Sequence, residues 1–111
     1  MSDCLFCKMV AGEITPSVVF EDDEFLAFND IHPQAPIHIL IIPKRHISTL
    51  NEADDALLLG KLLQVSVKLS KQLNVAEAGY RTVINCNAQG GQVIYHLHVH
   101  LLAGRQLTDH R

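Results

Sequence analysis

The feature that most constrains the fold of this chain is an alternation close to its end, where residues 95–102 read YHLHVHLL. Successive side chains of a β-strand point to opposite faces, so a strand would place His96, His98 and His100 on the same face. A helix would scatter them, because residues two apart on a helix do not face each other. The aliphatic residues between the histidines also favour a strand. We therefore predict a strand across the three histidines.

The spacing of these histidines argues against one metal ion bound by all three. At a rise of about 3.3 Å per residue, the Cα atoms of His96 and His100 lie about 13 Å apart. Zinc–nitrogen bonds are only about 2.0–2.1 Å long, so at most two of the three imidazoles can share an ion without sharp bending. A merely solvated strand face is also disfavoured, because such faces are normally built from other polar residues. The pattern favours a chemical role.

The overall composition narrows the classes of function. The chain has 111 residues, 48% hydrophobic and 19% charged, which predicts one folded domain over residues 1–111. A net charge of −3 with neutral histidines argues against a nucleic-acid partner. The start, MSDCLFCK, has no positively charged leader, and the apolar run at 37–42 is too short to span a membrane. We therefore expect a cytoplasmic protein with neither a membrane nor a nucleic acid as partner.

The hydrophobic pattern predicts an α+β fold, in which one long helix packs on a mostly antiparallel sheet. The long helix is expected to begin at the N-cap Asn51 and to carry one apolar stripe. That stripe consists of Leu58, Leu62, Val65, Leu69 and Leu73. A short helix is expected at 4–12, with strands at 17–20, 25–28, 37–42 and 81–86 before the histidine strand. Loops at 30–36, with two prolines, and at 87–92, with two glycines, connect them.

The histidine strand and the glycine loop together suit chemistry at phosphorus. A neutral imidazole can act as a nucleophile when one nitrogen keeps a free lone pair and the other holds its proton against a fixed acceptor. A flanking histidine can donate to the charge that grows on the phosphoryl oxygens. The backbone at Gly90 and Gly91 allows N–H groups to approach the same oxygens. The residues therefore predict a site for a phosphate ester or amide.

The sequence also resembles a known family. The segment at 95–102 resembles the histidine-triad (HIT) motif, and the segments at 27–47, 79–92 and 101–107 resemble the Hint branch of that family. The resemblance implies a HIT-like, five-stranded, mostly antiparallel sheet with one long and one short helix, which forms a homodimer with a ten-stranded sheet. It also implies a nucleotide hydrolase or transferase of the adenosine 5′-monophosphoramidase type, which requires no cofactor. Its substrates would be purine nucleoside phosphoramidates or aminoacyl-adenylate-like compounds, attacked at the α-phosphate.

The resemblance assigns roles to four histidines. His98 would be the nucleophile and form a covalent nucleotidyl-histidine that water then hydrolyses. His100 would bind the phosphate, and His96 would support the ring of His98 from behind. His38 matches a fourth family histidine that helps to orient the nucleophile. Without the resemblance, His38 would be interpreted as a core histidine whose ring is satisfied by the backbone.

The resemblance also assigns the nucleotide-binding positions. Asp30 matches a carboxylate that hydrogen-bonds the ribose hydroxyls, although an aspartate there can also simply form a turn. Asn85 and Gly91 match phosphate-contacting positions, and the binding loop continues through Gln92 and Val93. Apolar walls around the base, each of which could equally be core, fall on Leu5, Phe6, Met9, Phe28, Ile31 and Leu40.

One position departs from the family pattern. Many Hint proteins have a serine after the Gly-Gln pair, and its hydroxyl helps the leaving group, whereas this chain has Val93. The backbone N–H is retained and the hydroxyl donor is lost. Turnover is therefore expected to be slower, or to depend more on the leaving group itself.

The cysteines raise the question of a metal. An odd number of cysteines rules out complete pairing within the chain, and Cys86 lies in an apolar run that favours a buried thiol. Cys4 and Cys7 form a C-x-x-C pair, which with two histidines can make a tetrahedral structural zinc site. By resemblance, the two histidines would be His46 and His96. A redox role is less well supported, because no thioredoxin-like βαβ pattern accompanies the pair.

Two other functions remain open at this stage. Within the same fold, the chain could be a dinucleoside-polyphosphate hydrolase of the Fhit type, although residues 34–36 and the Gly-Gly-Gln segment favour Hint. From a different class, it could be a nucleotide-binding interaction module with little turnover, in which the histidines only hold a phosphate. Val93 supports that second alternative.

Overall fold

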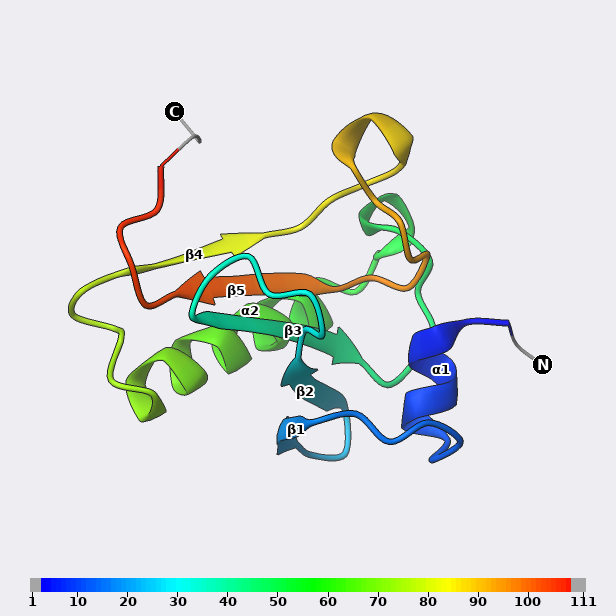
Figure 1. The fold of residues 1–111 in the computed structure, drawn as a ribbon. Helices are drawn as coiled ribbons and strands as arrows, with labels where there is room; N and C mark the ends of the chain where they lie inside the picture. Colours follow the sequence, from blue (N-terminus) through cyan, green and yellow to red (C-terminus); the bar gives the residue numbers. More distant parts are fainter. Residues whose placement is uncertain (1–2, 109–111) are drawn as a thin grey trace.

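Five β-strands form the sheet of the computed structural model, which describes residues 3–108 (Figure 1). Their order across the sheet is β1-β2-β3-β5-β4, and each neighbouring pair is antiparallel. The elements are α1 (Leu5–Val10), β1 (Val18–Glu21), β2 (Phe25–Asn29), β3 (Ile37–Pro43), α2 (Ala56–Gln72), β4 (Tyr80–Val83) and β5 (Val99–Ala103). The predicted α+β fold, with five antiparallel strands, one long helix and one short helix, is confirmed.

The two faces of the sheet bury different sets of side chains. Alternate residues of the central strands, such as Ile39, Ile41 and Val99, share one apolar core with the buried face of α2. The residues between them, such as Leu40, share a smaller core with Phe6 of α1. β3 is therefore buried on both faces, as its continuous apolar run predicts.

The long helix begins later than predicted. Its N-cap is Asp55, whose carboxylate accepts a hydrogen bond from the N–H of Leu58 at 3.1 Å. The predicted cap, Asn51, lies instead in a short 3₁₀ turn at Leu50–Glu52. The apolar stripe is buried up to Leu69, but Leu73 follows the last helical residue and is 38% exposed. Among the described residues, no helix combines the length and the apolar character needed to cross a membrane.

The predicted strand across the three histidines is wrong for two of them. β5 begins only at Val99, so His100 lies in a strand while His96 and His98 lie in the irregular segment before it. The N–H of Leu97 donates to the carbonyl of Ile47 at 2.6 Å, beyond the end of β3. The segment is therefore held by a loop rather than by the ladder of the sheet. The alternation of faces nevertheless persists, because Leu97, Val99 and Leu101 all pack in the α2 core.

β4 also ends earlier than predicted, at Val83 rather than at residue 86. The chain then bends into the loop that leads back to β5, and Asn87 adopts a left-handed φ of 63° there. β4 and β5 pair as antiparallel neighbours, so the loop returns beside the histidines as expected.

Candidate active site and metal centre

The histidines divide into two groups that use different partners. One group, which we call the carboxylate cluster, consists of Asp30, His38, His98 and His100. The other, which we call the thiol cluster, consists of Cys4, Cys7, His46 and His96. His96 and His98 are two residues apart in the sequence, and their rings lie in different clusters.

The ring of His98 is held in the form that a nucleophile requires. Its Nδ1 lies 2.6 Å from the carbonyl oxygen of His96, so Nδ1 carries the proton and Nε2 keeps its lone pair. Burial lowers the pKa of His98, against the opposing effects of this hydrogen bond and of the negative charge of Asp30. Phe6 contacts the ring edge to face, with the ring centroids 5.2 Å apart. His98 is therefore a neutral, fixed imidazole with one free lone pair.

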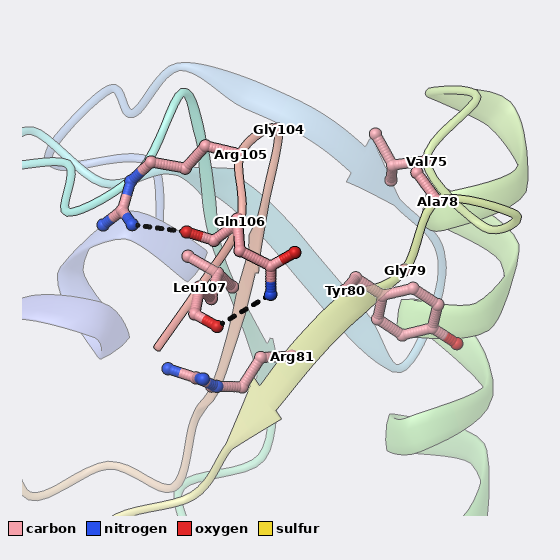
Figure 2. A pocket seen from close by; sticks show the side chains of 9 residues that line it. All are labelled: Val75, Ala78, Gly79, Tyr80, Arg81, Gly104, Arg105, Gln106 and Leu107. Atoms are coloured by element: carbon pink, nitrogen blue, oxygen red, sulfur yellow. Dashed lines mark hydrogen bonds between the residues drawn. The ribbon is translucent and has the colours of Figure 1, made fainter. Parts of the chain in front are cut away.

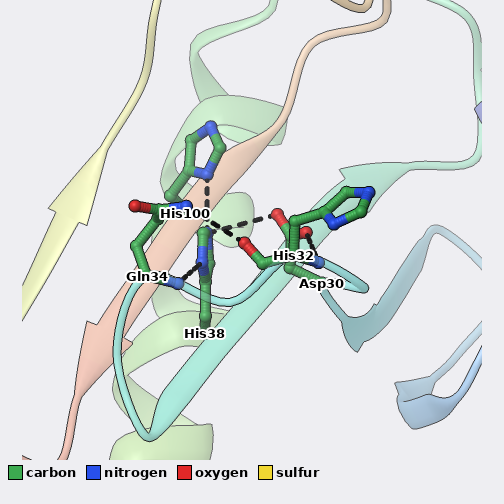
Figure 3. A network of polar contacts seen from close by, with 5 residues as sticks. All are labelled: Asp30, His32, Gln34, His38 and His100. Carbon is green, nitrogen blue, oxygen red and sulfur yellow. Dashed lines mark hydrogen bonds and ion pairs between the residues drawn. The ribbon is translucent and has the colours of Figure 1, made fainter.

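His38 is held by a backbone donor on one side of its ring. The N–H of Gln34 donates to Nδ1 of His38 at 3.0 Å, so the proton of this ring is on Nε2 (Figure 3). That Nε2 lies 3.0 Å from Nδ1 of His100 and 3.4 Å from Oδ2 of Asp30. Burial lowers the pKa of His38, and Asp30 opposes the shift. His38 is thus a neutral donor between a carboxylate and the next imidazole.

The orientation of His38 determines the tautomer of His100. Because His38 donates from Nε2, His100 accepts at Nδ1 and carries its own proton on Nε2. The pKa of His100 is lowered to about 4, first by burial and then by His98 and His38, while Asp30 opposes the shift. Sheet register supports the contact, since His100 pairs with Leu40, two residues along β3 from His38. His100 is a neutral N–H donor beside the lone pair of His98, and the two ring centroids are 5.0 Å apart.

Asp30 has both features that its sequence position predicts. Its Oδ1 accepts the N–H of His32 at 2.8 Å and so forms a turn, while its Oδ2 faces His38. The backbone N–H of Asp30 donates to the carbonyl of His38 at 2.9 Å, which anchors residue 30 to the start of β3. The carboxylate is only partly buried and retains acceptor capacity toward a ligand.

The loop between β4 and β5 is organised by the side chain of Gln92. Its Oε1 accepts the N–H of Asn87 at 2.8 Å, and its Nε2 donates to the carbonyls of Ser48 at 2.9 Å and Ile94 at 3.1 Å. The N–H of Gln92 donates to the carbonyl of Asn87 at 3.1 Å. The polar groups of Gln92 are therefore occupied by the protein itself, and this residue holds the predicted binding loop in shape.

The structure brings the predicted phosphate-contacting residues Asn85 and Gly91 together. A Cβ atom on Gly91 would lie 4.0 Å from Nδ2 of Asn85, and Gly91 adopts a φ of 86°, which favours glycine.

The predicted apolar walls separate into two sets. Phe6, Phe28 and Leu40 are buried in the α1 core, and Met9 packs against that core, as the alternative interpretation allowed. Leu5, at 39%, and Ile31, at 85%, are exposed and free to contact a ligand, as is Val93 of the predicted binding loop, at 86%. Because Phe6 also contacts the rings of His96 and His98, it belongs to the core and lines the site.

The thiol cluster has the dimensions of a tetrahedral metal site. His96 Nδ1 lies 3.3 Å from the sulfur of Cys4, 3.6 Å from that of Cys7 and 3.2 Å from Nδ1 of His46. Cys7 Sγ and His46 Nδ1 are 3.2 Å apart. Ligand atoms of a tetrahedral zinc site are about 3.3–3.8 Å apart, given zinc–sulfur bonds of about 2.3 Å and zinc–nitrogen bonds of about 2.0–2.1 Å. The four predicted residues therefore fit zinc.

The tautomer of His96 supports the same conclusion. His96 is fully buried, and its Nε2 donates to the carbonyl of Pro43 at 2.8 Å, so Nδ1 presents its lone pair to the cluster. Such an outer hydrogen bond is what fixes metal-binding histidines in general. Burial lowers the pKa of His96, the Pro43 hydrogen bond opposes this, and His46 and His98 add to the lowering. The neutral ring is the form that binds a metal.

Sequence reasoning missed the contacts that hold the loop at 30–36. The N–H of Gln34 orients His38, and the guanidinium of Arg105 donates to the carbonyl of Gln34 at 2.8 Å. The two prolines of the loop signal that it is ordered, but no local pattern identifies a backbone N–H as the partner of a ring 4 residues away.

Fold and site together define a histidine-triad protein, in which imidazoles of fixed tautomer lie in and just before a strand of a five-stranded sheet. The chain belongs to the HIT family: the HIT domain matches residues 11–107. It is 46% identical to purine nucleoside phosphoramidase of Escherichia coli (strain K12) over 95% of this chain and 90% of that protein.

Solved structures agree with this assignment. A HIT family hydrolase from Legionella pneumophila Philadelphia 1 superposes with a TM-score of 0.93 and 55% identity, covering 96% of each chain. A histidine triad protein from Clostridium difficile has a TM-score of 0.95 and 41% identity over 100% of this chain and 98% of that one. The family resemblance inferred from the motifs is confirmed.

Proposed function

We propose that this protein is a hydrolase that cleaves purine nucleoside phosphoramidates, or aminoacyl-adenylate-like compounds, at the α-phosphate. The observation that carries the proposal is the ring of His98, whose Nδ1–H is held by the carbonyl of His96 while its Nε2 lone pair stays free. The similarity to a protein named purine nucleoside phosphoramidase supports the choice of substrate.

The reaction follows from the tautomers. Nε2 of His98 attacks phosphorus and forms a P–N bond. The bond from phosphorus to the leaving group breaks, and the leaving group departs with the electron pair of that bond and takes up a proton from water. A water molecule then attacks the phosphorus of the nucleotidyl-histidine and loses a proton to solvent. The P–Nε2 bond breaks, and its electron pair returns to Nε2 of His98. His100 donates Nε2–H to a phosphoryl oxygen in both steps.

The remaining residues position the nucleotide. The carboxylate of Asp30 accepts hydrogen bonds from the ribose hydroxyls. The loop held by Gln92 presents Asn85 and the backbone at Gly91 and Val93 to the phosphate. The apolar wall for the base would consist of the exposed side chains of Leu5 and Ile31 and of four residues of the α1 core, Phe6, Met9, Phe28 and Leu40.

The test compares the wild type with His98→Ala on adenosine 5′-phosphoramidate and, in parallel, on a diadenosine polyphosphate. Turnover of the phosphoramidate by the wild type alone supports the proposal. Preference for the polyphosphate would favour the Fhit-type alternative. Binding of AMP without turnover of either compound would identify a nucleotide-binding module, and the exposed, aliphatic Val93 would then be the leading explanation.

We also propose that the thiol cluster binds one structural zinc ion through Cys4, Cys7, His46 and His96. A bound ion would join the start of α1 to the segment before β5, and none of the reaction steps above uses it. The test is metal analysis of protein purified without a nickel column. We expect about one zinc per chain, and less than about a tenth of that would overturn the proposal.

We propose further that the protein is a homodimer. Within residues 3–108, β4 pairs only with β5, so one side of β4 is an open sheet edge. A groove of about 510 Å³ runs along this end, between β4 and the segment after β5 (Figure 2). On the outer side of α2, Leu63 is 42% exposed and Val67 is 40% exposed. A second copy would cover both features, and light scattering should give twice the chain mass for the wild type and the chain mass for Val67→Glu.

A further inference from the structure

We propose that Arg105 is a positioning residue for the histidines of the carboxylate cluster, acting through Gln34. This inference rests on the proposed function for its kinetic consequence, but its structural part can be tested without turnover. Arg105 follows β5 in the turn that begins with Gly104, and its Nη2 donates to the carbonyl of Gln34 at 2.8 Å. It lies outside the triad motif, 5 residues after His100.

The turn at Gly104 is shaped to lie against the loop at 30–36. Gly104 has a φ of 101°, and a Cβ atom there would lie 2.8 Å from Cβ of Pro36. A side chain at this position would therefore collide with the loop and force the two segments apart. The close approach brings the guanidinium of Arg105 to Gln34, and a second hydrogen bond, from Nη1 to the carbonyl of Gln106 at 3.1 Å, keeps the guanidinium on that side (Figure 2).

Between the two prolines of this loop, the backbone of Gln34 is restrained by hydrogen bonds to other segments. Proline fixes its own φ and restricts the residue before it, so Pro33 and Pro36 limit the backbone at 32, 33, 35 and 36. Between residues 32 and 36, only residue 34 keeps both backbone dihedrals free of these restrictions. The N–H and the carbonyl of Gln34 belong to the two peptide units on either side of it. Hydrogen bonds to His38 at 3.0 Å and from Arg105 at 2.8 Å therefore hold both units.

The consequence reaches the reacting atoms in two steps. The N–H of Gln34 keeps Nδ1 of His38 unprotonated, so His38 donates from Nε2 (Figure 3). That donor meets Nδ1 of His100 at 3.0 Å, which leaves Nε2–H of His100 for the phosphoryl oxygen. If Gln34 turns away, only the 3.4 Å contact with Asp30 still favours the proton on Nε2 of His38, and the donor on His100 is less firmly fixed. Asp30 is held separately, by its own bonds to His32 and His38, so binding of the ribose should change little.

Three variants test the inference. Arg105→Ala removes the donor, Arg105→Lys restores a shorter-reaching donor to the same carbonyl, and Arg81→Ala removes the other arginine that lines the same groove. Arg81 makes no side-chain hydrogen bond to the 30–36 loop within the described part of the chain, which makes it the matched control. The measurements are the ¹⁵N shifts of the His38 ring, with kcat and KM for adenosine 5′-phosphoramidate.

We expect Arg105→Ala to lower kcat by about tenfold with KM changed less than about twofold. In the same variant, the two ring nitrogens of His38 should lose their distinct acceptor and donor shifts. Arg105→Lys should recover part of both effects, and Arg81→Ala should show neither. If the His38 shifts are unchanged in Arg105→Ala, or change equally in Arg81→Ala, the inference is wrong. If the wild type proves inactive, the proposed function fails, and a tautomer change confined to Arg105→Ala still supports the positioning role.

Discussion

The carboxylate cluster and the thiol cluster use the same side chain in opposite ways. In the thiol cluster, Nε2–H of His96 donates a hydrogen bond to the carbonyl of Pro43. Nδ1 of the same ring therefore faces two sulfur atoms and a second imidazole. In the carboxylate cluster, Nδ1–H of His98 donates a hydrogen bond to the carbonyl of His96, which leaves the lone pair of Nε2 free. The backbone oxygen that each ring meets decides which nitrogen is available. That choice separates a proposed metal ligand from a proposed nucleophile, although the two residues lie on one short segment.

The two clusters also share one residue. The ring of His96 belongs to the thiol cluster, while its carbonyl holds the ring of His98. A metal ion bound by the ring would therefore restrain the backbone that orients the nucleophile. Replacing the side chain of His98 spares both the ring and the carbonyl of His96, so we expect that change to leave the thiol cluster intact.

The largest expected effect is on the carboxylate cluster. Replacing His98 by alanine removes the proposed nucleophile, so phosphoramidate turnover should fall by at least about 10³-fold. Zinc content should be unchanged, because the carbonyl of residue 96 and the ring of His96 remain. The measurement is steady-state hydrolysis together with metal analysis of the same preparation. Loss of zinc in this variant would contradict the separation of the clusters.

The corresponding change in the thiol cluster is Cys7→Ser. It removes one of four ligand atoms, so zinc should be lost and the free energy of unfolding should fall by at least about 2 kcal/mol. Cys86→Ser is the matched control, because Cys86 lies outside the cluster. Urea unfolding and metal analysis measure both effects. Equal stability of the two variants would show that the thiol cluster contributes nothing as a metal site.

A third change tests whether Asp30 binds the nucleotide or only orders its loop. Asn at this position keeps an oxygen for the N–H of His32 but loses the negative charge. We expect Asp30→Asn to raise KM by about tenfold, because hydrogen bonds to charged groups are stronger than neutral ones. Calorimetric binding of AMP provides an independent measurement. An unchanged affinity for AMP would show that Asp30 only forms the turn with His32.

The pH dependence distinguishes the clusters further, because His100 is a half-buried ring outside the proposed metal site. Its pKa is lowered to about 4 in the folded protein, chiefly by burial, against about 6.5 in an unfolded chain. Between these values the unfolded chain binds a proton that the folded protein does not bind, so stability is lost as the pH falls through this window. Urea unfolding of wild type and His100→Gln should show a steeper loss for the wild type. An NMR titration that places His100 near its ordinary pKa would contradict this.

The smallest expected effect is on the leaving group. Val93 is 86% exposed and offers no side-chain donor, so Val93→Ser should raise turnover of a poor leaving group by about fivefold, the value of one modest hydrogen bond. Val93→Thr adds a hydroxyl with a similar branched shape and serves as a second variant. A series of phosphoramidates with amines of different pKa would measure the effect. An equal rate for valine and serine would mean that the leaving group departs without help from this position.

Much of the fold was predictable because its signals are local. The continuous apolar run of β3, the stripe of α2 and the alternation around His98 each report which side of an element faces a core. The strand across His96 was wrong because sheet pairing depends on a partner. Beside this segment, the N–H of Leu97 bonds to Ile47 in a loop, and β5 pairs with β3 only from Val99 onward.

The candidate residues were also largely predictable, because residue types and order within the motifs carry the family resemblance. The sequence by itself determined that imidazoles alternate with aliphatic residues, and hence that Leu97, Val99 and Leu101 enter the α2 core while the histidines point to the other side. It also determined which ligand types a zinc ion would find. These properties depend on covalent order and on the short repeat of an extended chain.

Only the tertiary structure decided what each imidazole can do. The proton of His96 is placed by Pro43, that of His38 by Gln34 and that of His100 by His38. Arg105 in turn holds Gln34 from the other end of the chain. A histidine tautomer depends on the geometry of one hydrogen bond. For His96 and His38 the partner is a backbone group, and for His100 it is a ring on the neighbouring strand. Sequence therefore cannot mark these partners, and only the folded arrangement brings them to the rings.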